Sequence, residues 1–157
     1  MSFDSKRQRQ IMGRLATGVT IVSTKAGDDG WGMTANAVTS LSLEPPLVLV
    51  AVARDSQTHT HLEQSRFFAI SILSEEQEDL SNRFAFKGPK DFSGLDVKTA
   101  VTGAPILKDS IGWVDCRLTE ILPGGDHDIF LGEIVAGDAG DGRPLLFYEG
   151  KYGRIGD

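Results

Sequence analysis

The sequence predicts a mainly β protein, an antiparallel barrel that is closed or nearly closed and carries a few short peripheral helices. About seven short segments have the composition of strands, against two or three with helical patterns, and the two kinds do not alternate as in a doubly wound sheet. The 157 residues include 18 glycines and 6 prolines, which indicates many turns. The length predicts a single domain over residues 1–157.

Capping patterns predict the helices. Each begins with Ser or Thr, followed three residues later by Glu or Gln, which is the pattern of a capping box. The pairs are Ser5 with Gln8, Thr60 with Glu63, and Ser74 with Gln77. We expect helices over residues 5–16, over residues 58–64 and from residue 74 onward.

β-branched and alternating apolar residues predict the strands. The continuous apolar run 47–53 predicts a central buried strand, and alternation over residues 113–118 places Val114, Cys116 and Leu118 on one face. A glycine-rich turn at 123–127 predicts a hairpin between the strands on either side of it. In chain order, we expect strands at residues 18–24, from 31 onward, and at 47–53, 67–73, 111–122, 128–136, 144–148 and 152–155.

Charge and hydropathy exclude several classes of protein. Sixteen Lys and Arg against 22 Asp and Glu give a net charge of −6, which disfavours nucleic acid and anionic membranes as partners. No apolar run approaches the roughly 20 residues that span a bilayer. The first ten residues lack the apolar region of a signal peptide. We therefore expect a cytoplasmic protein.

Cysteine and histidine usage argues against a metal site. Cys116 is the single cysteine, so neither an intrachain disulfide nor a multi-cysteine zinc site can form. Its place on an apolar strand face indicates a core residue rather than a nucleophile. His59 and His61 would point about 200° apart on a helix, so they would not share a ligand.

A polar stretch after residue 30 is a candidate ligand site. Residues 30–35 match the loose glycine fingerprint of dinucleotide sites, but no βαβ unit surrounds them. Thr34, Asn36, Thr39 and Ser40 carry hydroxyl and amide groups that could bind a phosphate or a polyol chain. A polar turn region without a ligand is the alternative.

Two further segments have both a functional and a structural interpretation. Ser56 and Thr58 follow a predicted buried strand, where they could bind a ligand, cap a helix, or do both. Arg83, Lys87 and Lys90 form the densest positive cluster in the chain. A phosphate-bearing ligand would need such a cluster, although cations at a helix C-terminus also simply complement the helix dipole.

His127 lies at the glycine-rich turn of the predicted hairpin. Its ring would offer a flat surface and a switchable donor near neutral pH, whereas the structural alternative is a surface histidine in a plain turn. The chain has no nucleophile-elbow sequence, so we do not expect a hydrolase.

Seven short stretches, spread over nearly the whole chain, together resemble a known family. They are residues 17–22, 32–37, 41–47, 56–58, 80–85, 125–127 and 150–152. In this order they are similar to the short-chain flavin reductases, NAD(P)H:flavin oxidoreductases of the FMN-binding split-barrel superfamily. The family often has Ser where this chain has Ala37, which removes one hydroxyl contact to flavin, and Asp where it has Glu44.

The resemblance implies an antiparallel split β-barrel of Greek-key type, assembled as a homodimer with flavin near the subunit interface. It implies hydride transfer from NADH or NADPH to FMN or FAD, with the reduced flavin supplied to a flavin-dependent monooxygenase. It places His127, the implied catalytic residue, beside the nicotinamide. The implied flavin-binding residues are Thr34, Ala35, Asn36, Ala37, Ser40, Val52, Ala53, Arg54, Ser56, Thr58, Ser81, Phe84, Ala85, Lys87 and Tyr152.

Two other functions stay open at this point. One is a protein that binds flavin or haem without oxidising a nicotinamide, and the other is an FMN-dependent reductase of a non-flavin substrate. Because the cofactors carry the hydride chemistry, the protein needs no nucleophile, metal or acid–base pair for the predicted reaction. The Gly-Asp-His sequence at residues 125–127 favours the reductase, since a plain flavin binder has no need of it.

Overall fold

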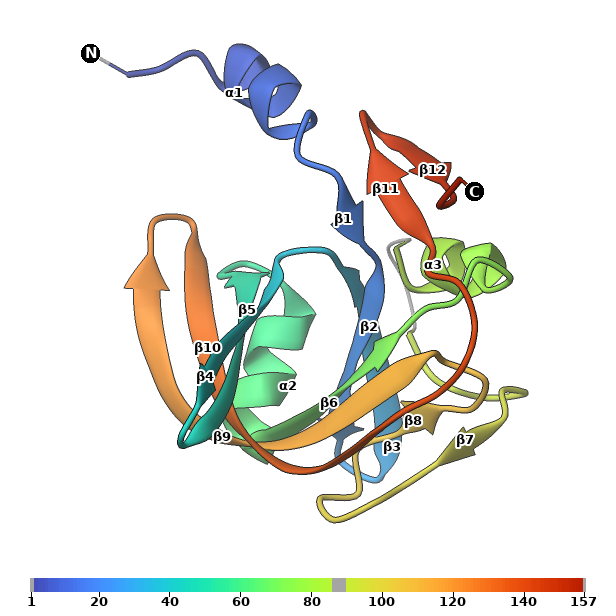
Figure 1. The fold of residues 1–157 in the computed structure, drawn as a ribbon. Helices are drawn as coiled ribbons and strands as arrows, with labels where there is room; N and C mark the ends of the chain where they lie inside the picture. The colour runs from blue at the N-terminus through green and yellow to red at the C-terminus, as the bar shows by residue number, and fades with distance from the viewer. Residues whose placement is uncertain (1, 86–89, 157) are drawn as a thin grey trace.

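The computed structural model describes residues 2–85 and 90–156, and its central feature is an antiparallel barrel (Figure 1). Seven strands form the main sheet in the order β3-β2-β6-β9-β10-β5-β4. They are β2 (Thr20–Ala26), β3 (Asp29–Ala35), β4 (Val38–Leu43), β5 (Pro46–Ala53), β6 (Phe67–Ile72), β9 (Gly112–Gly124) and β10 (His127–Ala139). The predicted mainly β, antiparallel fold is confirmed.

Five short strands and three helices surround the barrel. The first small sheet contains β1 (Thr17–Gly18), β11 (Leu146–Tyr148) and β12 (Lys151–Gly153), and the second contains β7 (Val97–Lys98) and β8 (Ile106–Leu107). The helices are α1 (Ser5–Met12), α2 (Gln57–Ser65) and α3 (Glu78–Ala85).

The barrel is open along one seam. Strands β3 and β4 are the two ends of the seven-stranded order, and within the described residues no ladder joins them. Helix α2 lies in this opening and packs against β2, β3 and β5 (Figure 1). Its buried Leu62 joins Val50, Phe68 and Phe130 in the main core. A helix therefore completes the apolar interior that the sheet leaves uncovered.

The burial of β5 corrects one prediction. The apolar run 47–53 forms a strand, but the strand is second from the edge of the sheet rather than central. Val48, Val50 and Val52 are buried, whereas Leu47 and Leu49 are only half-buried. An antiparallel barrel strand has one face in the core and one outside, so an unbroken apolar run does not require burial on both faces.

The helix caps also differ from two of the predicted capping boxes. Asp4, rather than Ser5, caps α1 by accepting the N–H of Lys6 at 3.0 Å. The helix ends at Met12, short of residue 16, and Gly13 follows as its C-cap. Every residue of α1 is exposed, so no buried face extends the helix further.

In α2 the predicted cap Thr60 is wrong, but the alternative that Ser56 caps this helix is confirmed, because its Oγ accepts the N–H of His59 at 3.2 Å. The third predicted pair is confirmed in part, because Gln77 Oε1 accepts the N–H of Ser74 at 2.9 Å. The helix α3 itself begins later, at Glu78.

The β9–β10 hairpin is longer than predicted. Each strand has 13 residues, and only Gly125 and Asp126 form the turn. Gly125 has a φ of 78°, which a glycine adopts without strain. His127 is consequently the first residue of β10 rather than part of a loop. Its backbone is held by pairing with Gly124 on β9 and Ala53 on β5.

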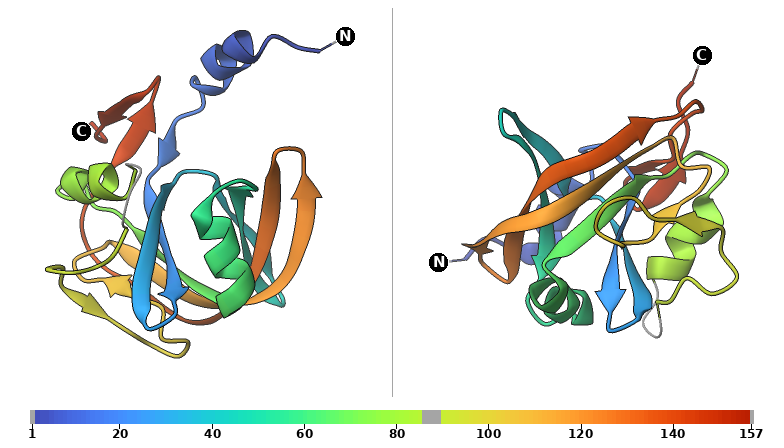
Figure 2. Two further views of the ribbon diagram at one scale, coloured as in Figure 1. Left: turned by 180° about the vertical axis from the view of Figure 1, so that it is seen from behind. Right: turned by 90° about the horizontal axis from the view of Figure 1, so that it is seen from below.

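Helix α1 stands away from the barrel (Figure 2). None of its residues is buried, and Ile11 and Met12 expose 52% and 55% of their surface. Among the described residues, no helix is long and apolar enough to cross a membrane.

Candidate functional site

A pocket of about 290 Å³ lies between β3, α3 and β12. Its walls are mostly apolar, and several polar side chains reach it. The lining residues are Val19, Met33, Thr34, Asn36, Ser81, Phe84, Ala85, Lys90, Phe147 and Tyr152. The structure thus brings together six of the predicted flavin-binding residues, namely Thr34, Asn36, Ser81, Phe84, Ala85 and Tyr152.

A hydrogen-bond chain runs along one wall of this pocket. Thr34 Oγ1 donates to the carbonyl oxygen of Ser81 at 2.6 Å, and Ser81 Oγ lies 2.6 Å from the Tyr152 hydroxyl. The Tyr152 hydroxyl donates in turn to Asn82 Oδ1 at 3.1 Å, so Ser81 is the donor to Tyr152. Ser81 is fully buried. Its hydroxyl therefore orients Tyr152.

Aromatic rings form the apolar part of the pocket. Phe84 is fully buried, and the rings of Phe147 and Tyr152 meet edge to face at 5.6 Å. Flat apolar walls with a few polar groups are typical of small-molecule sites and fit a planar heterocycle. Asn36 is exposed at the edge of the pocket, where its amide is accessible to a ligand.

The predicted positive cluster does not face this pocket as a group. Arg83 lies 3.3 Å from the carboxylate of Asp91 and donates to the carbonyl oxygens of Asp91 and Ser93. Lys90 does line the pocket; its ammonium donates to the Phe84 carbonyl oxygen at 2.8 Å, and burial lowers its pKa. Lys87 lies outside the described residues.

A second group of predicted residues lies where β5 ends, α2 begins and β10 starts. Their side chains are already engaged in the fold. Val52 points into the main core, and Thr58 Oγ1 accepts the indole N–H of Trp31 at 2.9 Å. Ser56 Oγ donates to the Ala53 carbonyl oxygen at 2.7 Å and caps α2. A flavin contact from Val52, Ala53, Ser56 or Thr58 stays a prediction.

Three predicted residues lie at the seam rather than in a pocket. Ala35 is buried and its carbonyl oxygen accepts the Thr20 hydroxyl at 2.7 Å. Ala37 and Ser40 are exposed, the first between β3 and β4 and the second on edge strand β4. Their role toward flavin also stays a prediction.

His127 is an exposed and oriented histidine. Its side chain is 45% exposed, and its Nδ1 lies 2.8 Å from Asp126 Oδ1. The hydrogen bond with His127 lowers the pKa of Asp126. With Nδ1 engaged, Nε2 is the ring nitrogen that a ligand at this surface would meet.

Sequence reasoning missed Asp128, the next residue. Its Oδ2 lies 2.7 Å from His59 Nε2, and its Oδ1 accepts from Arg54 Nε at 2.9 Å. The pKa of Asp128 is lowered, chiefly by the hydrogen bond with His59 and further by Arg54. Strand alternation was the available signal, because it places Asp128 on the opposite face of β10 from His127.

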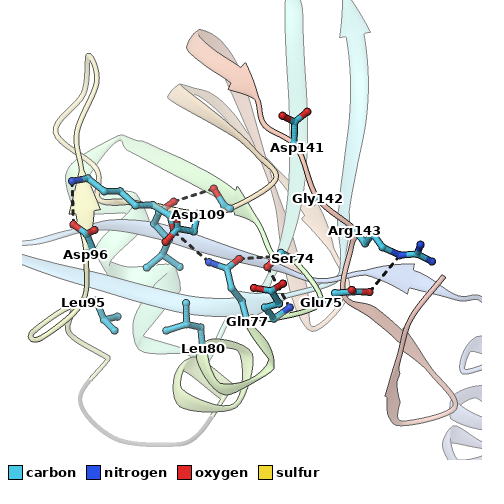
Figure 3. A pocket seen from close by; sticks show the side chains of 14 residues that line it. Ser74, Glu75, Gln77, Leu80, Leu95, Asp96, Asp109, Asp141, Gly142 and Arg143 are labelled. Carbon is cyan, nitrogen blue, oxygen red and sulfur yellow. Dashed lines mark hydrogen bonds and ion pairs between the residues drawn. The ribbon is translucent and has the colours of Figure 1, made fainter. Parts of the chain in front are cut away.

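A larger pocket lies elsewhere, and its many carboxylates make it unsuited to a phosphate. It measures about 820 Å³ and lies beside the start of α3 (Figure 3). Five carboxylates line it, from Glu75, Glu76, Asp96, Asp109 and Asp141. Its two cations lie near acids of the same pocket, Lys108 at 3.1 Å from Asp96 and Arg143 at 3.6 Å from Glu75. It contains none of the predicted site residues.

Cys116 is a core residue rather than a nucleophile. Cys116 is fully buried, and burial raises the pKa of its thiol to about 12. The thiolate is thus absent at neutral pH, so the prediction of a core cysteine is confirmed. In the part of the chain that the structure describes, no group of three or more His, Cys, Asp and Glu could hold a metal ion.

Comparisons with known proteins identify the family. The model of the flavin reductase like domain matches residues 12–156. The chain is 38% identical over 154 residues to the reductase subunit of a flavin-dependent monooxygenase from Rhodococcus jostii, covering 96% of this chain and 78% of that protein. It is 36% identical over 152 residues to an NADH-dependent FMN reductase from Agrobacterium fabrum, covering 97% and 87%.

Solved structures agree with the sequence comparison. The NADH:FAD oxidoreductase of Streptomyces globisporus, in complex with NAD and FAD fragments, superposes with a TM-score of 0.92. The two are 34% identical, and the match covers 99% of this chain and 97% of that chain. The matched residues span the barrel, the pocket at α3 and the His127 hairpin, and the chain belongs to the flavin reductase like domain family.

Proposed function

We propose that this protein is an NADH-dependent flavin reductase, which reduces FMN or FAD and supplies the reduced flavin to a partner monooxygenase. The observation that carries the proposal is the pocket at α3, where six residues expected from the family resemblance converge from β3, α3 and β12. Its donor set and aromatic walls fit a flavin. Relatives named as reductase subunits and as an NADH-dependent FMN reductase support the same activity.

The residues of the site have two tasks, to hold the flavin and to position the nicotinamide. When bound, nicotinamide and flavin supply the hydride donor and the hydride acceptor. The walls made by Phe84, Phe147 and Tyr152 hold the planar ligand and exclude water, and the Asn36 amide offers hydrogen bonds at the edge. His127, oriented by Asp126, presents Nε2 to the nicotinamide. No residue of the chain needs to form a covalent bond with either ligand.

We also infer that two copies associate, and that a second copy completes the flavin site. A pocket of about 290 Å³ is at the small end of the range of about 300–1,000 Å³ that drug-sized ligands occupy. Leu43 on edge strand β4 is 92% exposed, and α1 leaves Ile11 and Met12 uncovered. Helix α1 is basic, with Lys6, Arg7 and Arg9, in a chain whose net charge is −6. These surfaces fit a second copy by apolar area and by opposite charge.

The activity is tested by following NADH absorbance with and without added FMN or FAD. Oxidation that scales with added flavin supports the reductase, and NADPH in place of NADH measures the nicotinamide preference. Bound flavin or haem without nicotinamide oxidation would instead support a non-catalytic binder. Tightly bound FMN that is reduced and reoxidised only when a further substrate is added would support an FMN-dependent reductase of a non-flavin substrate.

Association is tested separately by sedimentation. The parent is expected to sediment as a dimer, and Leu43→Glu is expected to weaken that dimer by placing a charge on the exposed edge. A parent that stays monomeric at high concentration would overturn the second inference without affecting the first.

A further inference from the structure

A network of charged side chains joins three elements next to His127. Asp128 follows His127 on β10 and faces the N-terminal turn of α2. Its carboxylate meets His59 Nε2 at 2.7 Å and Arg54 Nε at 2.9 Å. Arg54 follows the end of β5, and His59 lies in the first turn of α2. One carboxylate therefore connects β5, α2 and β10.

The contact between His59 and Asp128 is mostly shielded from water, whereas Arg54 is half exposed. The side chains of His59 and Asp128 are only 11% and 15% exposed. The His59 ring meets Phe130 edge to face, with the ring centroids 5.0 Å apart. Removing Asp128 leaves a shielded ring nitrogen of His59 without its carboxylate partner, which costs free energy, whereas removing His59 leaves Asp128 with Arg54.

Both ring nitrogens of His59 lie next to carboxylates. Nδ1 lies 3.1 Å from Glu63 Oε1, and Nε2 lies 2.7 Å from Asp128 Oδ2. The charged groups that the structure places around the ring are Glu63 from α2, Asp128 from β10 and, behind Asp128, Arg54.

The same network holds residues 126 and 128, which flank His127. The backbone N–H of Arg54 donates to the Asp126 carbonyl oxygen at 3.0 Å, while the Arg54 side chain holds Asp128. Residues 126 and 128 are therefore both tied to the end of β5. His127, between them, has an exposed side chain that is paired only with the exposed carboxylate of Asp126 in the contacts described above.

We propose that His59 and Asp128 are positioning residues for nicotinamide use, which hold the start of β10, and with it His127, against α2 and the end of β5. This inference rests on the proposed function. It assigns His59 no contact with the nicotinamide, because its side chain is only 11% exposed and packs against Phe130. The pair acts through the backbone of residues 126–128.

The test measures NADH and flavin separately in matched variants. His59→Ala and Asp128→Asn are expected to raise the KM for NADH or lower kcat/KM for NADH about tenfold, because a small misplacement of an orienting group costs that much. Flavin binding, measured by fluorescence, is expected to change less than about twofold. His59→Gln keeps one donor toward Asp128 and is expected to restore part of the loss.

His61→Gln is the control. It changes a histidine on the same helix whose ring packs at a tilt against Trp31, with the ring centroids 4.5 Å apart, instead of meeting Asp128. It is expected to match the parent in NADH and flavin use. A merely structural role for His59 would instead lower the stability and weaken flavin and NADH use alike.

Rescue by the conservative variant gives a readout that a merely structural role would not move. Urea unfolding of each variant shows which of them are folded, so that NADH use is compared between folded proteins. A folded His59→Gln variant with no better kcat/KM for NADH than His59→Ala would overturn the inference.

The inference and the proposed function fail in different ways. If the parent oxidises NADH with added flavin but folded His59→Ala and Asp128→Asn keep the parent's kcat/KM for NADH, the positioning role is wrong and the reductase stands. If the parent shows no flavin-dependent NADH oxidation, the proposed function is wrong, and the positioning role falls with it.

Discussion

The Ser81 hydroxyl lies 2.6 Å from the Tyr152 hydroxyl and joins helix α3 to strand β12 across the wall of the pocket. Ser81 belongs to the middle of the chain and Tyr152 to its end, and Thr34 from β3 bonds to the Ser81 carbonyl oxygen. Three separate elements therefore share one polar contact. The shape of the proposed flavin site depends on their alignment.

Replacing Tyr152 by Phe is expected to weaken flavin binding several-fold. The change removes one hydroxyl and leaves the buried Ser81 hydroxyl without its acceptor, which also costs about 1–3 kcal/mol of unfolding free energy. Fluorescence titration and urea unfolding measure the two effects. Tyr148→Phe is the control, because Tyr148 is 42% exposed and lines no described pocket of the site. Equal behaviour of the two variants would contradict the role of Tyr152.

Replacing His127 by Ala is expected to impair nicotinamide use selectively. His127 is exposed and holds no buried structure together, so the variant is expected to fold and to bind flavin almost as the parent does. The KM for NADH is expected to rise about tenfold, as for the loss of one binding contact. Steady-state kinetics and flavin titration provide the comparison. An equal loss of flavin and NADH binding would show that the assignment of His127 is wrong.

Asp128 is expected to make stability depend on pH in the acid range. Its pKa is held below the ordinary value of 3.8 by His59 and then by Arg54. A lowered folded-state pKa stabilises the protein fully above the unfolded-state value, and this contribution is lost as the pH falls below it. Urea midpoints measured from about pH 6 to pH 3 are expected to fall less in Asp128→Asn than in the parent. Urea midpoints that fall equally with pH in the parent and in Asp128→Asn would argue against this contribution of Asp128 to stability.

The Cys116 thiol is expected to be inert in the folded protein. Burial raises its pKa to about 12, so it carries almost no thiolate at pH 8. An aromatic disulfide reagent is expected to react with it only in urea, with one thiol released per chain. Rapid labelling without denaturant, or loss of NADH oxidation on labelling, would be inconsistent with a purely structural cysteine.

Gly132→Ala is expected to destabilise the barrel by about 1–3 kcal/mol, as overpacking does. A Cβ at this position would lie 2.5 Å from the Phe68 ring and 2.9 Å from Cys116 Cβ. Gly153→Ala is the matched control, since a Cβ there would meet nothing within 4 Å. Urea unfolding of both variants measures the difference. A Gly132→Ala variant as stable as the control would show that the core accommodates the methyl group.

Local patterns predicted the elements better than their ends. The apolar and β-branched runs correspond to β2, β5, β6, β9 and β10. The predicted cap of α1 was wrong because Asp4 and Ser5 stand side by side, and either side chain can accept a backbone N–H. The seam between β3 and β4 was beyond local reasoning, because it depends on which strands pair across the whole barrel.

The candidate site was also predicted only in part. Thr34, Asn36, Ser81, Phe84, Ala85 and Tyr152 were expected together from the family resemblance, and one pocket contains them. The hydroxyls of Ser56 and Thr58 were correctly identified as polar groups after a strand, but the fold already uses them as a cap and as an indole acceptor. A sequence shows which groups can donate, but not which of them already have partners.

By itself, the sequence determined the β-rich character, the core position of Cys116, the hairpin before His127 and the resemblance to flavin reductases. Each of these follows from neighbours in the chain, or from short stretches that keep their order. Only the tertiary structure decided that His59 meets Asp128, which is 69 residues away, and that Arg83 turns to Asp91 instead of the pocket. Such pairs depend on distances set by strand register and helix packing, and no local pattern encodes them.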